Sequence, residues 1–304
     1  MTLNIKTSTE EHEWQTEFDQ WIEQGTATST RRAYGRDVKY FWQWMQSHLS
    51  QSETYPATHS DVIQFCLYHL KADSPAYLKV STLRRYLASL SIAHKEMGFD
   101  SPTAHHQVKL LLKRAKAARI ERPEQKAAIT QDILDDMLAT CDDTLKGVRD
   151  KALLMLAFYS GGRRRSEIVN LTHGDISKTK EGYLLFLRKS KTDQEAHGFT
   201  VPLTGEAAAA LKAWLLKSGI RDGQLFRGIK SNLTLYPAIT GSEIYKIVKK
   251  RIALAGFDAH HFSPHSLRAG FITESVTSGK TIYETMLYSG HKDPVTAQRY
   301  IRLK

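Results

Sequence analysis

Cysteine is scarce in this chain, with two residues in 304. Cys66 and Cys141 stand far apart and form no CxxC pair, which leaves a disulfide framework or a thiolate zinc cluster without support. We therefore expect a reducing cytoplasm as its compartment. Long apolar runs are also missing, because the longest, residues 152–159, is far short of the roughly 20 residues that a membrane helix requires. The N-terminus has no basic segment followed by an apolar one, so we do not expect export.

The standard motifs of nucleotide binding and hydrolysis are absent as well. The sequence contains no P-loop, no GxGxxG after a strand, no GxSxG and no HExxH. His261 and His265 have the i, i+4 spacing of a metal-binding pair, but Pro264 lies between them and Asp258 is the only carboxylate close by. We therefore expect neither a metal nor a cofactor.

Positive charge, by contrast, is abundant. Lys and Arg number 43 against 32 Asp and Glu, which gives a formal net charge of +11 and a pI of about 9.5. The first 23 residues are acidic, and the basic excess is spread over the rest of the chain. Such a balance predicts a polyanionic partner. Ribosomal, membrane-surface and heparin-binding proteins share it, however, so charge alone identifies no function.

The pattern of apolar residues divides the chain into two domains. Spacings of three and four predict four helices in the first 120 residues, beginning near residues 30, 60, 81 and 102. Residues 121–128 combine a proline with several charges and no large apolar side chain, which predicts an exposed linker. We therefore assign a helical domain to residues 1–122, a linker to 123–128 and a second domain to 129–304.

The second domain is expected to be rich in helices with one small sheet. Only residues 183–188 and 199–203 show a convincing strand pattern, and they predict an antiparallel hairpin with Pro202 on an edge strand. Helices are expected near residues 130–141, 146–160, 205–218, 241–256, 264–277 and 281–289, with a short one from Pro294. The predicted fold class is therefore mainly α.

Cationic and imidazole side chains gather in the last 140 residues. Taken singly, each has an ordinary explanation, because an arginine run is usually a solvated face and one tyrosine is usually part of a core. As a set they suit the cleavage of a phosphodiester without a metal. Arginines neutralise the nonbridging oxygens, and a phenol becomes a nucleophile with help from a base and cations. A lysine on a loop can then protonate the leaving oxygen.

Five ordered motifs carry these side chains: GGRRRSEIVNL, KTDQ, HSLRAGF, SGHKDP and QRY. Together they resemble the tyrosine recombinase (phage integrase) family of site-specific DNA recombinases. The family signature is TGLRxSE, a hairpin lysine, HxLR and LGH, followed by a tyrosine nine positions later. The pattern TRRAYxxDxxxFxxW at residues 30–44 is similar to the family's core-binding domain. The chain departs from the signature at Gly161, Arg163 and Ser289, where the family has threonine, leucine and leucine.

The resemblance implies a SAM-like core-binding domain followed by a catalytic domain, without an arm-binding domain, as in Xer-sized members. It places the catalytic groups on Arg164, Lys191, His265, Arg268, His291 and Tyr300, with Glu167 in support. By this resemblance Tyr300 attacks a phosphodiester and forms a 3′-phosphotyrosyl link, while His265 assists the removal of its proton.

The remaining roles implied by the resemblance concern the phosphate and the leaving group. Arg164 and Arg268 hold the phosphate oxygens, with His291 as a further donor. Lys191 protonates the leaving 5′ oxygen, and Glu167 orients Arg164. The covalent link conserves the phosphoester energy, so neither ATP nor a metal is needed.

The implied function is site-specific DNA recombination. The expected partners are a double-stranded recombination site and further copies of the chain, as a homotetramer on synapsed DNA. No membrane is expected, and the DNA-bound protein is expected on the nucleoid. A type IB topoisomerase that reseals the same strand is one alternative. An inactive DNA-binding regulator with this fold is another, which loses ground because all six active positions are filled.

Two sets of basic residues in the first domain are candidate DNA contacts. Lys109, Lys113 and Lys116 fall at i, i+4 and i+7 of the last helix, and therefore on one face. This stripe suits phosphate contacts, with a solvated helix face as the alternative. Arg84 and Arg85, on the preceding helix, are candidates for base contacts, because arginine bonds guanine bidentately in a major groove.

Overall fold

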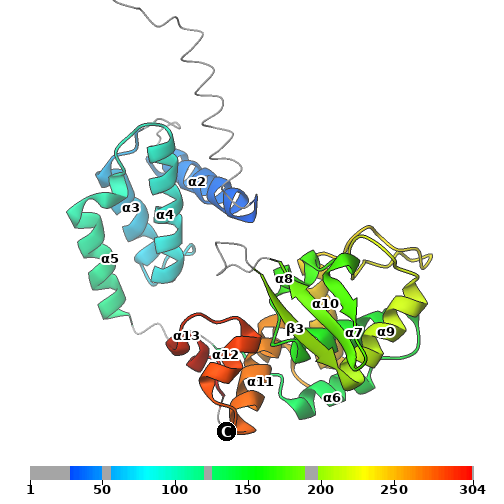
Figure 1. The fold of residues 1–304 in the computed structure, drawn as a ribbon. Coiled ribbons are helices and arrows are strands. Elements are labelled where there is room, and N and C mark those ends of the chain that lie inside the picture. Colours follow the sequence, from blue (N-terminus) through cyan, green and yellow to red (C-terminus); the bar gives the residue numbers. More distant parts are fainter. Residues whose placement is uncertain (1–27, 50–55, 120–124, 189–197, 303–304) are drawn as a thin grey trace, which may run out of the picture. The chain divides into compact units, whose positions relative to one another are not determined.

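The computed structural model describes residues 28–49, 56–119, 125–188 and 198–302, and the chain divides into two compact units, Met1–Pro123 and Glu124–Lys304 (Figure 1). No helix in these ranges is both long and apolar enough to cross a membrane. The same residues contain no group of three or more His, Cys, Asp or Glu side chains that could hold a metal ion.

The described part of the first unit consists of helices and one 3₁₀ turn: α2 (Thr28–Leu49), α3 (His59–Leu70), α4 (Val80–Glu96), η1 (Pro102–Ala104) and α5 (His106–Ala118). Their inward faces share an apolar core. Aromatic rings meet edge to face in it, with Phe65 at 5.2 Å between ring centroids from both Phe41 and Trp44. The helix predicted to begin near residue 102 is interrupted, because a proline turn precedes α5.

Helix α3 shows how local sequence fixes a helix start. The Thr58 hydroxyl accepts the Asp61 backbone N–H at 3.2 Å, and the Asp61 carboxylate accepts the Thr58 backbone N–H at 2.8 Å. This reciprocal cap satisfies two backbone donors of the first turn. The buried side of the helix includes His69, whose Nδ1 lies 2.6 Å from the Ala76 carbonyl. A polar side chain therefore occupies the core where its hydrogen bond is provided.

The described part of the second unit contains most of the secondary structure: α6 (Gln131–Ala139), α7 (Leu145–Tyr159), α8 (Arg165–Asn170), η2 (His173–Asp175), β1 (Ile176–Lys178), β2 (Gly182–Leu187), β3 (Phe199–Thr204), α9 (Gly205–Ser218), α10 (Gly241–Leu254), η3 (Ala259–His261), α11 (Pro264–Thr277), α12 (Ile282–Ser289) and α13 (Pro294–Gln298). The strands form one antiparallel sheet in the order β1-β2-β3. Pro202 lies on the edge strand β3, as its missing N–H requires. The predicted fold class, mainly α with a small antiparallel sheet, is confirmed.

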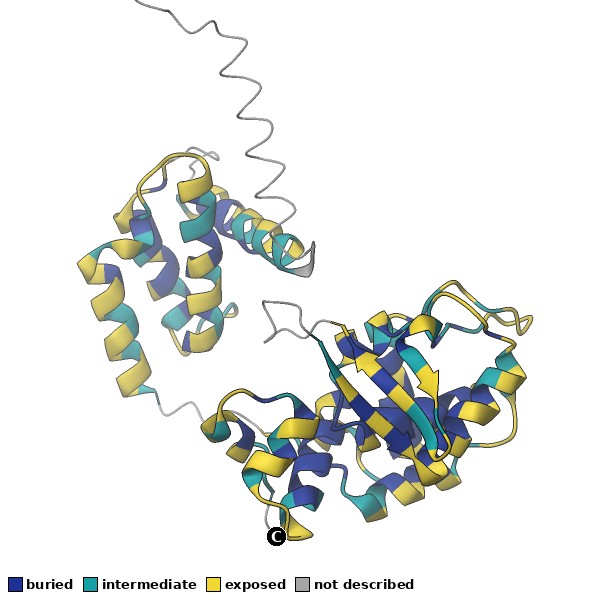
Figure 2. Cartoon of the chain, viewed as in Figure 1, coloured by how far each residue is buried: buried dark blue, intermediate teal, exposed yellow. Residues whose placement is uncertain are grey.

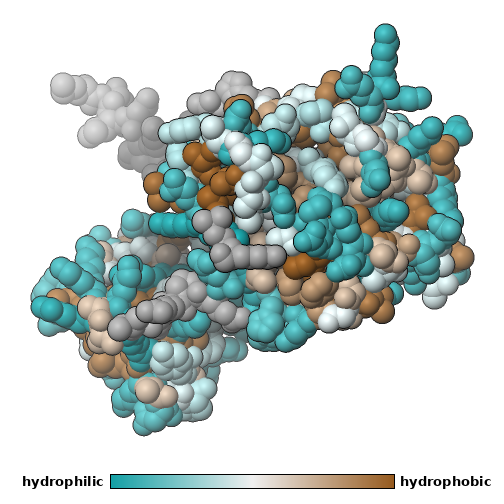
Figure 3. Space-filling model, turned by 90° about the horizontal axis from the view of Figure 1, so that it is seen from below, coloured by the Kyte–Doolittle hydropathy of each residue, from teal (hydrophilic) through white to brown (hydrophobic). Residues whose placement is uncertain are grey.

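Helix α7 lies in the core of this unit (Figure 2). Every residue from Ala152 to Phe158 is buried, and the helix packs against α9 and α11. The longest apolar run of the sequence is therefore a core helix. On the face shown in Figure 3, hydrophobic residues lie in separate groups among hydrophilic ones.

A buried ion-pair network fastens α7 to α10. Asp150 lies between two guanidiniums, with Arg149 Nη2 at 2.8 Å from one carboxylate oxygen and Arg251 Nη2 at 2.7 Å from the other. All three side chains are buried. Breaking such a pair costs about 3–5 kcal/mol, because an uncompensated charge is left in the interior.

Residues 125–129 run against η3 and the start of α11. The Ala127 N–H donates to the His261 carbonyl at 2.8 Å, and the Ile129 N–H donates to the Ser266 carbonyl at 2.9 Å. Ala128 and Ile129 are buried. The end of the segment predicted as linker is therefore packed on the second unit rather than exposed.

Candidate active site

Tyr300 and His265 are brought together although 35 positions separate them. Ser263 precedes α11 and Pro264 opens it, which places His265 in the first helical turn. Tyr300 lies two residues after the last residue of the short helix α13, with Arg299 as the C-cap between them. The Tyr300 hydroxyl and His265 Nε2 lie 2.7 Å apart and share a hydrogen bond. A phenol is thus in direct contact with a group that can take its proton.

The backbone around Tyr300 is attached to α11 through Thr273. The buried Thr273 hydroxyl donates to the Tyr300 carbonyl at 3.4 Å and accepts the Arg302 N–H at 3.1 Å. These two bonds hold the backbone at Tyr300 and Arg302 against α11, the helix that carries His265. Sequence patterns gave no sign of this role for Thr273, because one threonine on a core helix is ordinary.

Arg268, one turn after His265, joins three segments of the unit. Its wholly buried guanidinium donates from Nη1 to the Gly162 carbonyl at 2.9 Å and from Nη2 to the Ser289 carbonyl at 2.7 Å. Nη2 also lies 3.1 Å from Nε2 of His291. The Arg268 Nε–H is buried without a partner among the described residues.

Arg164 stands at the N-cap of α8 and is oriented by Glu167. One Glu167 oxygen accepts from Arg164 Nη1 at 2.8 Å, and the other accepts the Arg164 backbone N–H at 3.0 Å. The Glu167 side chain is almost fully buried, whereas that of Arg164 is 20% exposed. The carboxylate thus fixes the arginine while leaving part of its guanidinium accessible.

The electrostatics of the site favour an anion. Burial first, then the nearby Arg268 and Arg164, lower the pKa of His291 to about 3. The pKa of His265 is lowered by the same causes in the same order. Burial and the charge of Arg164 lower the pKa of Arg268 to about 9, so it stays protonated at neutral pH. The site therefore combines neutral imidazoles with mutually repelling guanidiniums, and a bound phosphate would relieve that repulsion.

A cavity of about 420 Å³ opens beside the tyrosine–histidine pair. Besides Tyr300 and His265, it is lined by the basic residues Lys126, Arg299 and Arg302. These three were not among the residues predicted from the sequence. The only available signal was the basic residue directly before the tyrosine.

The structure thus gathers Arg164, Glu167, His265, Arg268, His291 and Tyr300 in the second unit. Lys191 lies outside the described residues. The roles of these side chains remain predictions at this point, but their chemistry and proximity match what phosphodiester cleavage by a tyrosine needs.

The candidate DNA contacts of the first unit have different environments. Lys109, Lys113 and Lys116 are all exposed on α5. Arg84 is exposed on α4 as well, whereas Arg85 is ion-paired with the buried Asp37. The latter pair links α4 to α2, so Arg85 has a structural role that the sequence did not reveal.

The fold and this set of side chains agree with the class that the sequence suggested, the tyrosine recombinases. A profile of the "Phage integrase family" matches residues 127–304, and one of the "Phage integrase, N-terminal SAM-like domain" matches residues 17–95. The chain belongs to the phage integrase family, the tyrosine recombinases. The resemblance noted in the sequence is therefore confirmed.

Individual relatives agree with this assignment. The chain is 31% identical over 293 residues to an "Integrase/recombinase xerD homolog" of Selenomonas ruminantium, which covers 92% of this chain and 83% of that protein. It is 29% identical over 290 residues to the "Tyrosine recombinase XerD" of Proteus mirabilis, and the match covers 92% of this chain and 84% of that protein. A solved lambda integrase(75-356) dimer bound to a COC' core site shares the fold, with a TM-score of 0.63, 14% identity and coverage of 96% and 95%.

Proposed function

We propose that this protein is a site-specific DNA recombinase that cleaves and exchanges strands through a 3′-phosphotyrosyl intermediate. The observation that carries the proposal is the 2.7 Å hydrogen bond between Tyr300 and His265 inside a cluster of buried guanidiniums. A tyrosine next to a neutral base and beside cations is equipped to attack a phosphodiester. The names of the relatives support the same activity.

In the cleavage step the Tyr300 oxygen bonds to phosphorus while the bond from phosphorus to the 5′ oxygen breaks. The phenolic proton passes to His265, and Lys191 donates a proton to the departing oxygen. Arg164 and Arg268 stabilise the charge that builds on the nonbridging oxygens. The 5′-hydroxyl of a second duplex then reverses the step.

His291 supplies a further contact to the phosphate. Its ring centroid lies 5.1 Å from that of Tyr300, and its ring also contacts Arg268. Because its pKa is about 3, it acts as a neutral group at physiological pH. Strand exchange between two duplexes requires four cleavages, so we propose a homotetramer on synapsed DNA.

The proposal is tested by mapping covalent complexes. Purified full-length protein is incubated with fragmented host or element DNA in excess EDTA, and protein-linked DNA is recovered and sequenced. We expect linkage at a defined site, at a 3′ phosphate, together with recombinant junctions when two marked duplexes are supplied. Relaxation without junctions would indicate a topoisomerase. Sequence-specific binding without linkage would indicate an inactive regulator, and linkage that requires magnesium would contradict the mechanism.

The pH dependence of cleavage tests the role of His265. Because its pKa lies below the ordinary value of 6.5, the imidazole stays neutral, and able to accept a proton, below that pH. We expect the cleavage rate at subsaturating DNA to hold as pH falls to 6.5 and to decline only at lower pH. His265→Gln should cleave slowly and lose this acidic decline, whereas His261→Gln, an exposed neighbour, should retain it. A decline that persists in His265→Gln would assign it to another group.

The lysine stripe on α5 should contribute phosphate contacts. Each contact steepens the log–log dependence of affinity on salt by about 0.9. Changing Lys109, Lys113 and Lys116 to Gln should therefore flatten the slope by up to about 3, with cognate and random DNA weakened alike. The charge-matched control changes the exposed Lys71, Lys79 and Lys95 to Gln and should leave the slope unchanged.

A wild-type slope in the stripe variant would show that this face of α5 points away from DNA. Equal flattening in both triple variants would show that net charge, rather than the stripe, sets the slope.

A further inference from the structure

The three positions at which this chain departs from the family signature lie at one place in the structure. Nη2 of Arg163 donates to the carbonyls of Tyr288 and Gly161, the latter at 3.2 Å. Gly161 has a φ of +107°, and a Cβ there would overlap both the Tyr288 oxygen and Arg163 Nη2. Ser289 follows Tyr288 directly. A threonine at position 161 and an arginine at position 163 are therefore incompatible in this arrangement.

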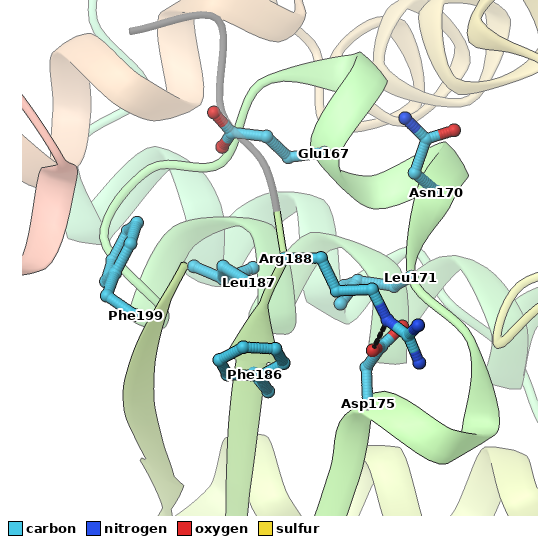
Figure 4. A pocket seen from close by; sticks show the side chains of 8 residues that line it. All are labelled: Glu167, Asn170, Leu171, Asp175, Phe186, Leu187, Arg188 and Phe199. Atoms are coloured by element: carbon cyan, nitrogen blue, oxygen red, sulfur yellow. Dashed lines mark hydrogen bonds and ion pairs between the residues drawn. The ribbon is translucent and has the colours of Figure 1, made fainter. Parts of the chain in front are cut away.

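Arg163 occupies a fully enclosed site in place of an apolar leucine. Its side chain is 1% exposed. Unlike Arg268, it contacts neither Tyr300 nor His291 among the described residues, so it is placed to support the site rather than to meet the phosphate. The guanidinium lies 3.7 Å from Glu167 and packs over the Phe199 ring at 5.3 Å from its centroid. Glu167 of α8 and Phe199 of β3 line one cavity (Figure 4). Its volume is about 240 Å³. Burying a guanidinium is costly, so its contacts must be offsetting that cost.

Two arginines share the C-terminal end of α12. Arg163 bonds the Tyr288 carbonyl, and Arg268 bonds the next carbonyl, that of Ser289. Cations are favoured there because the last carbonyls of a helix carry partial negative charge. Gly290 then turns the chain with a φ of +68°, and His291 follows. The Ser289 hydroxyl lies 2.8 Å from Nδ1 of His291. The location of the His291 ring is therefore set by this helix end.

We propose that Arg163 is a positioning residue that holds His291 in place for phosphate contact, and that Gly161 and Ser289 belong to the same arrangement. Gly161 provides the room for the guanidinium beside the Tyr288 carbonyl. Ser289 fixes the ring through Nδ1. The inference rests on the proposed function, because it explains Gly161, Arg163 and Ser289 by the role of His291 in DNA cleavage.

The experiment compares Arg163→Leu, which restores the family residue, with Arg163→Lys on a nicked duplex carrying the mapped site. Arg163→Leu should keep wild-type DNA affinity but cleave about 10- to 100-fold more slowly, as expected for a misplaced group near the reacting atoms. Arg163→Lys retains a cation and a donor for the Tyr288 carbonyl, so it should recover part of the rate.

The matched control is Arg251→Leu, another buried arginine of the same unit, which bonds Asp150 away from His291. It should lower the melting temperature and leave the cleavage rate unchanged where the protein stays folded. A double-mutant cycle completes the design. In the His291→Ala background, Arg163→Leu should add little, because both changes act through the same ring.

Wild-type cleavage by Arg163→Leu, or an equal slowing with and without His291, would overturn the positioning role. If Arg163→Leu does not fold, Arg163→Lys takes its place in the test. The positioning role would then be overturned if Arg163→Lys binds DNA and cleaves at the wild-type rate although its structure shows His291 displaced. Absence of any covalent adduct with the wild-type protein would instead contradict the proposed function.

Discussion

Tyr300→Phe should bind its DNA site with wild-type affinity and form no covalent complex with it. The substitution removes one hydroxyl, the group that bonds His265 at 2.7 Å, and leaves the ring in its contacts. Phenylalanine has no oxygen that could bond to phosphorus, so no phosphotyrosyl adduct can form at position 300. The arginines proposed to contact the phosphate are untouched, so binding should persist.

The measurement is a denaturing gel of protein joined to a nicked duplex, with affinity measured in parallel. Tyr283→Phe, an exposed tyrosine on α12, is the matched control and should give a wild-type adduct. An adduct formed by Tyr300→Phe would assign the attack to another tyrosine. The Tyr300 assignment is supported if Tyr300→Phe forms no adduct while Tyr283→Phe forms the normal amount.

Much of the fold follows from local sequence. Apolar residues at spacings of three and four located the main helices, and alternation with Pro202 located the hairpin and its edge. Several short features were missed, among them the 3₁₀ turns η2 and η3. Strand β1 has only three residues, too few to show alternation. The sequence from residue 102 onward was predicted as one helix, but the proline turn η1 is separate from α5.

The sequence motifs predicted which side chains would be candidates for the site, but not how those side chains would meet. Six of the predicted residues lie together in the structure, while their catalytic roles stay predictions. The hydrogen bond between His265 and Tyr300 joins segments 35 positions apart, and the ion pair between Asp37 and Arg85 joins segments 48 apart. Periodicity shows which side of a helix is buried. It does not show which side chain of another element will meet it.

The exposure of the three consecutive arginines at positions 163–165 could not be predicted from the sequence either. A run of three arginines is usually a solvated face, yet here each has a different environment. Arg163 is buried, Arg164 is partly accessible and Arg165 is exposed. The run lies where the turn at Gly161 and Gly162 leads into α8, so its three side chains do not share one helix face.

The leaving group should separate the role of Lys191 from that of the arginines. Lys191→Ala should cleave slowly when the departing atom is the normal 5′ oxygen, because no group delivers the proton that an alkoxide needs. With a 5′-bridging phosphorothiolate the departing thiolate needs no proton, so cleavage should recover to near the wild-type rate. Arg268→Ala should be slowed by about 10²–10³-fold on both substrates, because it loses stabilisation of the nonbridging oxygens.

Arg268 also supports the fold, since it bonds the Gly162 and Ser289 carbonyls. Arg268→Lys therefore accompanies the alanine variant, and both are compared at a temperature where DNA binding shows them folded. Lysine keeps a charge but not the two-pronged donor geometry, so its rate should stay low on either substrate. Recovery of the arginine variants to the same degree as Lys191→Ala would mean that Arg268 acts on the leaving oxygen. The division between charge stabilisation and proton delivery would then be wrong.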